Sequence, residues 1–265
     1  MKYIVDHDLH IHSQLSLCSK DPEQTAERML KYAEDNNYKT ICVTDHFWDE
    51  TVEGASNWYS RQDFAHICEI LPLPESKNIR FLFGCETEQN KFQTVGVSKE
   101  RFDSFGFVII PTTHFHMDDY TVTAEETATP QARANTWCRR FDELLKKDLP
   151  FEKIGIAHLT CGLIAREREI YLETLKLIPE TEAGELFTRA AKTGVGIELN
   201  ASDMGFEPEE QETVLRIYRI AKAAGCKFYC GSDAHHPKVF EYAKSIFENA
   251  VSLLELTEND KFIVG

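Results

Sequence analysis

The 265-residue chain lacks several features that mark membrane and secreted proteins. No stretch approaches the run of about 20 apolar residues that a membrane span requires. The opening residues, MKYIVDHDLHIHS, carry two Asp and three His where a secretory signal has an uninterrupted apolar segment. We therefore expect a cytoplasmic protein without a membrane partner.

Common catalytic and phosphate-binding signatures are missing as well. There is no GxSxG motif for a serine nucleophile, and no GxGxxG or GxxxxGK[ST] loop for a nucleotide. The eight cysteines never form a CxxC pair, which argues against a zinc ribbon. Without an export signal they are expected to be reduced thiols.

Basic residues are scarce: 29 Lys and Arg stand against 44 Asp and Glu, for a formal charge of −15. This balance argues against general binding of nucleic acid or anionic membranes, which require a basic surface. An acidic chain can still hold an anionic substrate where bound divalent cations reverse the charge of one pocket.

The apolar pattern predicts a single α/β domain covering residues 1–265. The chain contains no Ser/Gly linker, internal repeat or low-complexity tract. Seven near-continuous apolar runs are expected to be strands that alternate with helices, which favours parallel pairing in an α/β barrel or an open α/β sheet. The expected strands are Tyr3–Asp8, Thr40–Thr44, Ile79–Gly84, Phe105–Pro111, Lys153–Ala157, Gly194–Leu199 and Lys227–Cys230.

Helical spacing and boundary signals predict the helices between these strands. Asp21-Pro22 indicates a helix start, and Gly194 and Gly225 are expected as C-terminal caps of two later helices. The other expected helices are Asp63–Leu71, Arg133–Lys147, Thr181–Lys192, Pro208–Ala224 and His236–Ala250. The polar stretches 88–104 and 115–129 are expected to be loops that shape a site.

Most histidines fall at the ends of the expected strands. Seven of the ten do so, and only His66 lies inside an expected helix. The carboxyl ends of parallel strands gather on one face, so these side chains should form one cluster. The residues concerned are His10, His12, Asp45, His46, Glu86, His114, His116, His158, Asp233 and His235, and the sixth strand ends in Glu198-Leu199-Asn200.

Imidazoles mixed with carboxylates suit zinc, manganese or iron better than calcium or soft copper. His10 with His12, and Asp233 with His235, are two residues apart in extended chain and can share a site. Six His, one Glu and one Asp exceed the needs of one tetrahedral ion, so at least two ions are implied.

Each residue also has a structural reading. A lone His is more often a polar or capping residue, and this reading is preferred for His7, His116 and His236, although His116 could touch substrate. Asp8 and Asp45 either orient imidazoles or accept ordinary hydrogen bonds at strand ends. Cys18 is a thiolate ligand, a nucleophile or a small apolar residue, and its position favours a ligand.

In these motifs the chain resembles the PHP (polymerase and histidinol phosphatase) superfamily of metal-dependent phosphoesterases. The resemblance runs in order along almost the whole chain, and it implies a distorted (β/α)7 TIM-like barrel that holds two or three Zn, Mn or Fe ions. It rests on DLHIHS at 8–13, VTDH at 43–46, GCE at 84–86, PTTH at 111–114, IAHL at 156–159 and GSDAHHP at 231–237.

The resemblance also implies how the ligands are divided. His10, His12, Glu86 and Asp233 would surround one ion, and Glu86 would bridge to a second ion held by His114 and His158. A third ion would lie with His46, His235 and Cys18, where many relatives have His or Asp. The segment Ala157–Thr160 departs from the Gly-His-Leu-Asp of histidinol phosphatases, which weakens the case for that substrate.

We therefore expect hydrolysis of a small-molecule phosphomonoester, with L-histidinol phosphate as one candidate. A hydroxide bridging two ions, held by Glu86, Asp233 and His235, would attack phosphorus in line. Arg166 and Arg168, expected in the loop after the fifth strand, and His116 are candidate substrate-binding residues, and Lys20 is a weaker one. The alternatives are a nucleotide or oligonucleotide phosphoesterase, an amidohydrolase-like enzyme, and a non-catalytic metal-binding protein.

Overall fold

The computed structural model describes all of residues 1–265, whose strands form two parallel sheets. The first sheet has the order β1–β2–β3, with strands His7–Ile11, Thr40–Val43 and Arg80–Phe83. The second has the order β4–β5–β6–β7–β8, with strands Cys85–Glu86, Val108–Pro111, Ile154–Ala157, Gly196–Asn200 and Lys227–Gly231. Every pairing within the sheets is parallel, as the alternation of strands and helices predicted.

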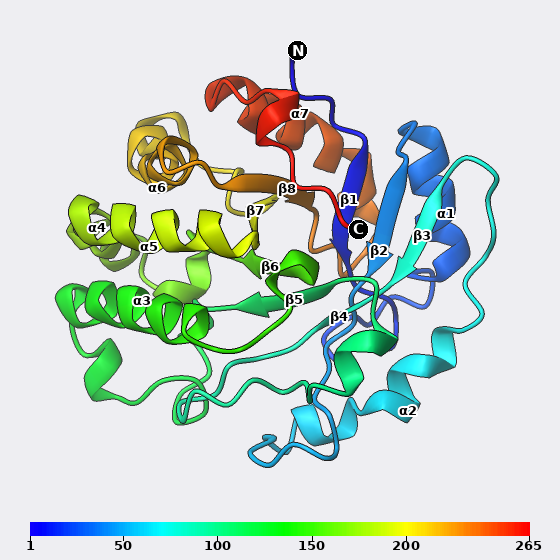
Figure 1. The fold of residues 1–265 in the computed structure, drawn as a ribbon, viewed down its shortest axis with the longest axis horizontal. Coiled ribbons are helices and arrows are strands. Elements are labelled where there is room, and N and C mark those ends of the chain that lie inside the picture. Colours follow the sequence, from blue (N-terminus) through cyan, green and yellow to red (C-terminus); the bar gives the residue numbers. More distant parts are fainter.

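Backbone hydrogen bonds join the two sheets on both sides, and Figure 1 shows β1 next to β8. β1 lies beside β8, where the N–H of Asp233 donates to the carbonyl oxygen of His10 over 2.7 Å. On the other side, the N–H of Glu86 donates to the carbonyl oxygen of Asp45 over 3.0 Å and ties β4 to the chain after β2. The two sheets therefore form a distorted TIM-like barrel, and the expected fold class is confirmed.

The structure has eight strands rather than the seven predicted, because the chain changes neighbours at Gly84. The N–H of Gly84 donates to Val43 of the first sheet, and the N–H of Cys85 donates to Phe107, beside the second sheet. A Cβ at Gly84 would lie 2.4 Å from the Phe107 carbonyl oxygen, so only glycine fits this switch. β1 also begins later than predicted, which places His10 inside the strand instead of after it.

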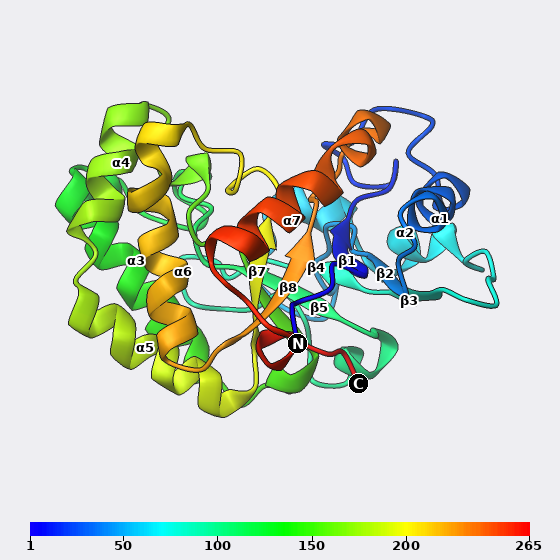
Figure 2. The same ribbon diagram turned by 90° about the horizontal axis from the view of Figure 1, so that it is seen from above.

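Seven α-helices cover the strands. Figure 2 shows α1 and α2 on the side of the first sheet and α3, α4, α5 and α6 grouped on the side of the second. α7 packs near β7. The bounds are α1 Ala26–Asp35, α2 Phe64–Ile67, α3 Pro130–Leu145, α4 Arg168–Leu177, α5 Glu180–Thr193, α6 Gln211–Ala223 and α7 Ala243–Leu253. None of them combines the length and apolar character that a membrane-spanning helix needs.

Two helices, α1 and α7, begin later than predicted because a turn precedes each of them. Asp21 accepts a hydrogen bond from the N–H of Glu23 in a turn, and α1 begins only after Thr25, whose side chain accepts from Arg28. α7 likewise starts late, because a 3-10 turn over Pro237–Glu241 precedes it. α4 was not predicted at all. At the other ends, Gly194 (φ 81°) closes α5 as expected, and Gly225 (φ 86°) follows α6.

The amino-terminal half of the barrel interior is filled by apolar side chains. Phe262 and Val264 from the C-terminal segment complete this cluster, and the N–H of Phe262 donates to the carbonyl oxygen of Phe228. The filled interior leaves the carboxyl ends of the strands as the place for a ligand site. The cluster consists of Leu9, Cys42, Leu82, Phe107, Ile109, Ala157, Tyr229, Phe262 and Val264.

Candidate metal centre

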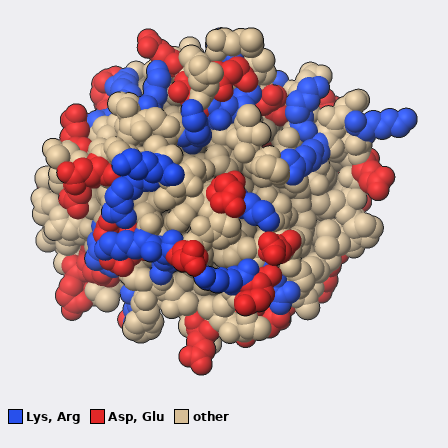
Figure 3. Space-filling model, viewed as in Figure 1, with Lys and Arg blue, Asp and Glu red and all other residues tan.

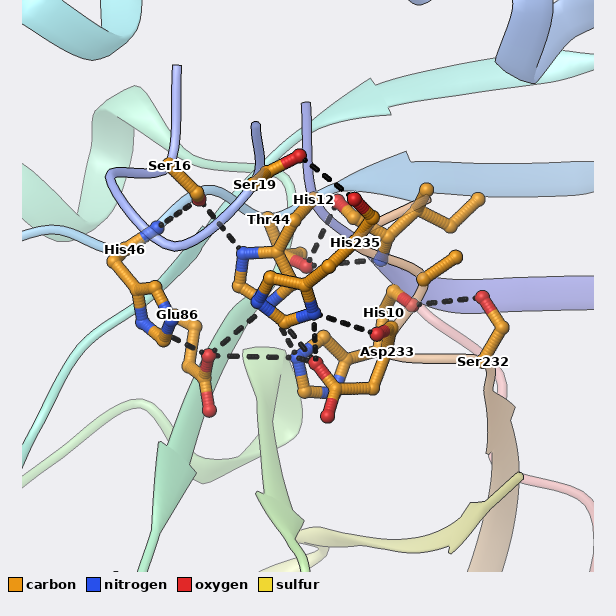
Figure 4. Close-up of polar contacts among 12 residues, drawn as sticks. His10, His12, Ser16, Ser19, Thr44, His46, Glu86, Ser232, Asp233 and His235 are labelled. Carbon is orange, nitrogen blue, oxygen red and sulfur yellow. Dashed lines mark hydrogen bonds and ion pairs between the residues drawn. The ribbon is translucent and has the colours of Figure 1, made fainter. Parts of the chain in front are cut away.

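Eight side chains from six strands meet at the carboxyl ends of the barrel, and Figure 4 shows six of them, His10, His12, His46, Glu86, Asp233 and His235. His10 lies in β1 and Glu86 ends β4, and the others follow strands directly or within a few residues. Most are buried, while Asp233 and His235 keep partial exposure. The structure thus brings together His10, His12, His46, Glu86, His114, His158, Asp233 and His235.

The first ligand group contains His10, Glu86, His158 and Asp233, whose candidate ligand atoms all lie within 4.8 Å of one another. Nε2 of His10 is 3.3 Å from Oδ1 of Asp233, and Nε2 of His158 is 3.3 Å from Oε1 of Glu86. His158 and Asp233 have left-handed backbone, with φ of 59° and 53°. Non-glycine residues in this region are strained by about 1 kcal/mol or more, and such strain concentrates at functional sites.

The second ligand group contains His12, His46 and His235. The rings of His12 and His235 are stacked with centroids 4.1 Å apart, and the rings of His12 and His46 are 4.5 Å apart. The resemblance placed Cys18 with His46 and His235, whereas here His12 completes the group. Cys18 is exposed at the cavity, and partial desolvation, with the carboxylates of Glu86 and Asp233, raises its pKa to about 12. Its role as a thiolate ligand stays a prediction.

Glu86 lies between the two groups. Its Oε2 is 3.0 Å from Nδ1 of His46 and 3.2 Å from Nε2 of His12, while its Oε1 faces Nε2 of His158. One carboxylate therefore presents an oxygen to each group. This is the placement of a bridging ligand in a two-metal site, where the ions are typically about 3.5–4 Å apart.

The contacts of the ring nitrogens of His10 and His12 show whether these residues can bind metal ions. Their Nε2 atoms lie 3.0 Å apart. Nδ1 of His10 is 2.6 Å from the carboxylate of Glu198, and Nδ1 of His12 is 2.8 Å from the hydroxyl of Ser16, which itself donates to Asp45. Both Nδ1 atoms therefore carry a proton, and the two Nε2 atoms face each other at a distance that a shared proton or a shared metal ion can span.

Two unprotonated nitrogens at this distance would repel, so a proton or a metal ion must lie between them. Ligand nitrogens about 2.0–2.1 Å from a shared ion stand roughly 3 Å apart, which matches the observed separation. Three further buried atoms, Nδ1 of His46, Oε2 of Glu86 and Oδ1 of Asp233, make no hydrogen bond of good geometry, although each lies 3.0–3.3 Å from another atom of the cluster. The residues present therefore fit divalent metal ions that accept nitrogen and oxygen ligands.

Glu198 holds the first group in place, and the sequence prediction did not include it as a site residue. Besides contacting His10, it accepts a hydrogen bond from the N–H of His158 over 3.1 Å. Carboxylates that orient ligand imidazoles in this way raise metal affinity. The strand-end rule that found the histidines would have found Glu198 too, because it lies near the end of the sixth predicted strand.

Asp45 and Asp8 occupy two different supporting positions. Asp45 accepts hydrogen bonds from the N–H and hydroxyl of Ser13 and from Ser16, so it orients His12 only through Ser16. Asp8 accepts from the backbone N–H groups of His10 and Ser232 and thereby ties β1 to β8. Burial raises the pKa of Asp8 to about 6.

His114 approaches the centre through a buried ion pair that sequence reasoning missed. Its Nε2 is 4.0 Å from Glu86, and it belongs to neither ligand group. Its Nδ1 contacts Glu88 over 2.8 Å, and Glu88 in turn pairs with the fully buried Arg140. The available signal was an arginine on the apolar face of a helix, three residues after Trp137.

A third group, His158, Cys161 and Asp203, lies behind the first. One oxygen of Asp203 accepts hydrogen bonds from the N–H of Thr160 and the hydroxyl of Tyr218, while the other is buried without a partner. Burial raises the pKa of Asp203 to about 6. A carboxylate thus lies against Thr160, where histidinol phosphatases have Asp in the chain.

The electrostatics of the cluster couple its acids and bases. Burial works against the charged forms, yet Glu198, Asp233 and Glu86 raise the pKa of His10 well above its usual value. Conversely, the imidazoles around Glu86 hold its pKa well below the usual range despite burial. Metal ions would take the place of these protons, because metal binding to such ligands releases protons.

Of the predicted substrate-binding residues, only His116 lines the cavity above the centre. Burial, together with His114 and His158, lowers its pKa to about 4, so it is neutral near pH 7. Arg168 is not in a loop, as predicted, but begins α4, where it pairs with Glu210 and lies over the ring of Tyr171. Arg166 and Lys20 are exposed and do not line the cavity.

The cavity has a volume of about 560 Å³ and opens directly over the ligand groups. Glu86 and Asp233 form part of its wall together with His46, His158 and His235. This is enough space for a small organic molecule to contact the centre.

Comparisons with known proteins agree with the expected family. A sequence model described as the PHP domain matches residues 8–202. The histidinol phosphate phosphatase of Lactococcus lactis, solved with zinc, L-histidinol and phosphate, is 16% identical; the match covers 94% of each chain with a TM-score of 0.59. A Listeria monocytogenes protein, provisionally described as a histidinol phosphatase, is 14% identical over 88% of this chain and 96% of that one, with a TM-score of 0.60. No curated protein gives a significant match.

Proposed function

The chain belongs to the PHP domain family, and from this membership and the geometry of the centre we propose that it is a metal-dependent phosphatase of small-molecule phosphomonoesters. The observation that carries the proposal is the position of Glu86 between the two ligand groups, with one oxygen toward each. A carboxylate shared by two cation sites is typical of hydrolytic centres that act on phosphate esters.

Divalent cations bound at the two groups would lower the pKa of bound water toward about 7 and neutralise phosphoryl oxygens. We propose two or three ions of zinc, manganese or iron, because the ligand set is rich in imidazole. Glu86, Asp233 and His235 line the cavity. In this proposal they would position the water oxygen that attacks phosphorus. No separate strong base is required.

The supporting residues keep the ligand rings in one orientation. Glu198 holds His10, the Ser16 hydroxyl holds His12, and Glu88 holds His114. Because these rings are fixed before substrate binds, the site loses little free energy to reorganisation when negative charge develops on the phosphoryl group.

A small molecule is favoured over a nucleic acid as substrate. The charge of −15 disfavours long polyanions, and on the face shown in Figure 3 basic side chains are interspersed with acidic ones. L-histidinol phosphate is one candidate, since the Lactococcus lactis structure holds L-histidinol and phosphate.

The test is to count bound metals by elemental analysis and then assay a panel of phosphomonoesters. We expect two or more ions per chain and release of phosphate. His12→Ala should abolish turnover while leaving the circular dichroism spectrum unchanged. Bound ions without hydrolysis of any ester, or activity on cyclic amides alone, would overturn the proposal in favour of a binding protein or an amidohydrolase.

A further inference from the structure

The cavity wall above the metal centre is aromatic and apolar. It is formed by Trp58 and Tyr59 from the segment after β2, Met117 and Tyr120 from the segment after β5, and Leu163 after β6. These segments come from three separate connections of the barrel. An apolar wall on one side and a polar floor of metal ligands on the other give the cavity two chemically distinct halves.

The aromatic part of the wall is packed directly onto the metal centre. The ring of Trp58 meets the ring of His46 edge to face with centroids 4.9 Å apart, and meets Tyr59 in the same way at 4.8 Å. Tyr59 and Tyr120 follow at 5.8 Å. Such mutually packed rings are held in place, so an apolar surface lies ready beside the position of a bound phosphoryl group.

The lining of the cavity holds no ionic partner for the part of a substrate beyond its phosphate. No Lys or Arg lines it, and its only carboxylates are Glu86 and Asp233, which belong to the metal centre. The charged side chains that act on His116, Arg166 and Asp118, lie outside this lining. A second phosphate or an ammonium group on the leaving alcohol would lose its hydration without gaining a counter-ion, which is unfavourable.

The wall also carries hydroxyl groups, on Ser56, Tyr59 and Tyr120. The hydroxyl of Tyr59, a fully buried residue, has no hydrogen-bond partner within the protein, although Tyr59 lines the cavity. Buried hydroxyl groups are rarely left unpaired. Because this hydroxyl has no accessible surface, a bound molecule would reach it only if neighbouring side chains moved.

We propose that the cavity selects phosphomonoesters of uncharged aromatic alcohols, whose ring packs against Trp58 and Tyr120. This inference rests on the proposed phosphatase activity and specifies the substrate class of the same site. Hydrolysis adds water across the P–O bond: the oxygen of water joins phosphorus, the leaving alkoxide takes up a proton, and the aromatic alcohol and inorganic phosphate are released. This substrate class places phosphomonoesters of uncharged aromatic alcohols above L-histidinol phosphate, which carries an ammonium group.

The inference is tested with metal-loaded protein and four esters. Hydrocinnamyl phosphate and phenylalaninol phosphate differ only by an ammonium group, propyl phosphate lacks the ring, and propanediol bisphosphate carries a second phosphate. Burying a phenyl ring is worth enough to raise kcat/KM about tenfold or more. We expect hydrocinnamyl phosphate to exceed each of the other three by at least that factor.

A binding measurement separates recognition from turnover. Calorimetry on metal-loaded protein should show hydrocinnamyl alcohol binding more tightly than phenylalaninol. Trp58→Leu should reduce the ratio of kcat/KM for hydrocinnamyl over propyl phosphate about fivefold, mainly through KM. Phe92→Leu is the matched control, because Phe92 is an exposed aromatic residue outside the cavity. Metal content of each variant is measured alongside.

The outcomes distinguish this inference from the proposed function. If the esters are hydrolysed but phenylalaninol phosphate or the bisphosphate is preferred, the selectivity is wrong and the phosphatase remains. If Trp58→Leu leaves the ratio of kcat/KM for hydrocinnamyl over propyl phosphate unchanged, Trp58 does not bind the ring of the substrate, and the proposed selectivity is wrong while the phosphatase remains. If metal-loaded protein hydrolyses none of the esters, the proposed function fails and the substrate class fails with it.

Discussion

Nδ1 of His10 and Oε1 of Glu198 lie 2.6 Å apart, although their strands, β1 and β7, are separated by β8. The contact passes over Gly231 of β8, where a Cβ would lie 2.1 Å from Oε1 of Glu198 and 2.7 Å from the Cβ of His10. A carboxylate reaches the imidazole across an intervening strand because that strand has no side chain at this position. The orientation of His10 therefore depends on two residues far from it in sequence.

Glu198→Gln tests this orienting contact. The amide is similar in size but accepts the Nδ1 proton of His10 less strongly, so metal affinity should fall about 10- to 100-fold while the fold is retained. Competition with a chelator monitored by elemental analysis gives the affinity. Glu185→Gln, a change on the distant α5 helix, serves as the control. Equal affinities in the two variants would mean that Glu198 does not support the centre.

Gly231→Ala tests the close approach itself. The added methyl group collides with Glu198 and His10, so we expect unfolding free energy to fall by about 1–3 kcal/mol and metal affinity to fall with it. Chemical denaturation of metal-free and metal-loaded protein measures both effects. Gly162→Ala is the control, because a Cβ there meets no atom within 4 Å. A Gly231→Ala protein as stable as the control would contradict the geometry.

Arg140→Leu tests the buried ion pair behind His114. The change leaves Glu88 without its charged partner and removes hydrogen bonds to the carbonyl oxygens of Thr112, Gln89 and Thr121. Loss of one member of a buried pair typically costs about 3–5 kcal/mol. Urea unfolding should show this loss, whereas Arg219→Leu, which breaks a surface pair with Glu212, should cost about 1 kcal/mol or less.

The buried imidazole of His7, which lies outside the metal centre, should make the stability of the fold depend on pH. Burial lowers its pKa from 6.5, and its Nε2 accepts a hydrogen bond from the N–H of Cys230, which only the neutral ring can do. The unfolded chain binds a proton near pH 6.5 and the folded chain does not. His7 therefore stabilises the fold above pH 6.5, and this contribution declines as the pH falls through the folded-state pKa.

The measurement is urea unfolding of metal-loaded protein between pH 7.5 and about pH 5. Relative to His7→Gln, the native protein should lose up to about 1.4 kcal/mol more per pH unit below pH 6.5, which corresponds to one proton. Parallel pH profiles for the two proteins would show that His7 does not titrate in this way.

The positions of the candidate ligands follow from the sequence because they depend on local patterns. Each candidate ligand lies at or near the end of an apolar run, and parallel strands bring those ends to one face whatever the lengths of the connections. The PHP motifs carry the same information in fixed order, and the family match confirms that resemblance. The alternation of strands and helices predicted parallel pairing but fitted an open sheet as well as a barrel, and the resemblance to the PHP superfamily implied the barrel.

The sequence could not show how the ligands are divided and supported. His12 lies within ligand distance of His46 and His235, and this grouping depends on how β1 and β8 meet. The contact of Glu198 with His10 joins residues 188 positions apart. Arg168 illustrates the same limit, since its pairing with Glu210 removes it from the substrate side.

The sequence by itself thus determined which residues could bind metal, and at which end of the strands, since strand periodicity and parallel pairing are local properties. Only the tertiary structure decided which of these side chains lie within ligand distance of one another, which carboxylates hold the rings, and that the cavity wall is aromatic and lined by no Lys or Arg. Those features arise from contacts over distances of a few ångströms between segments that the chain order does not bring together.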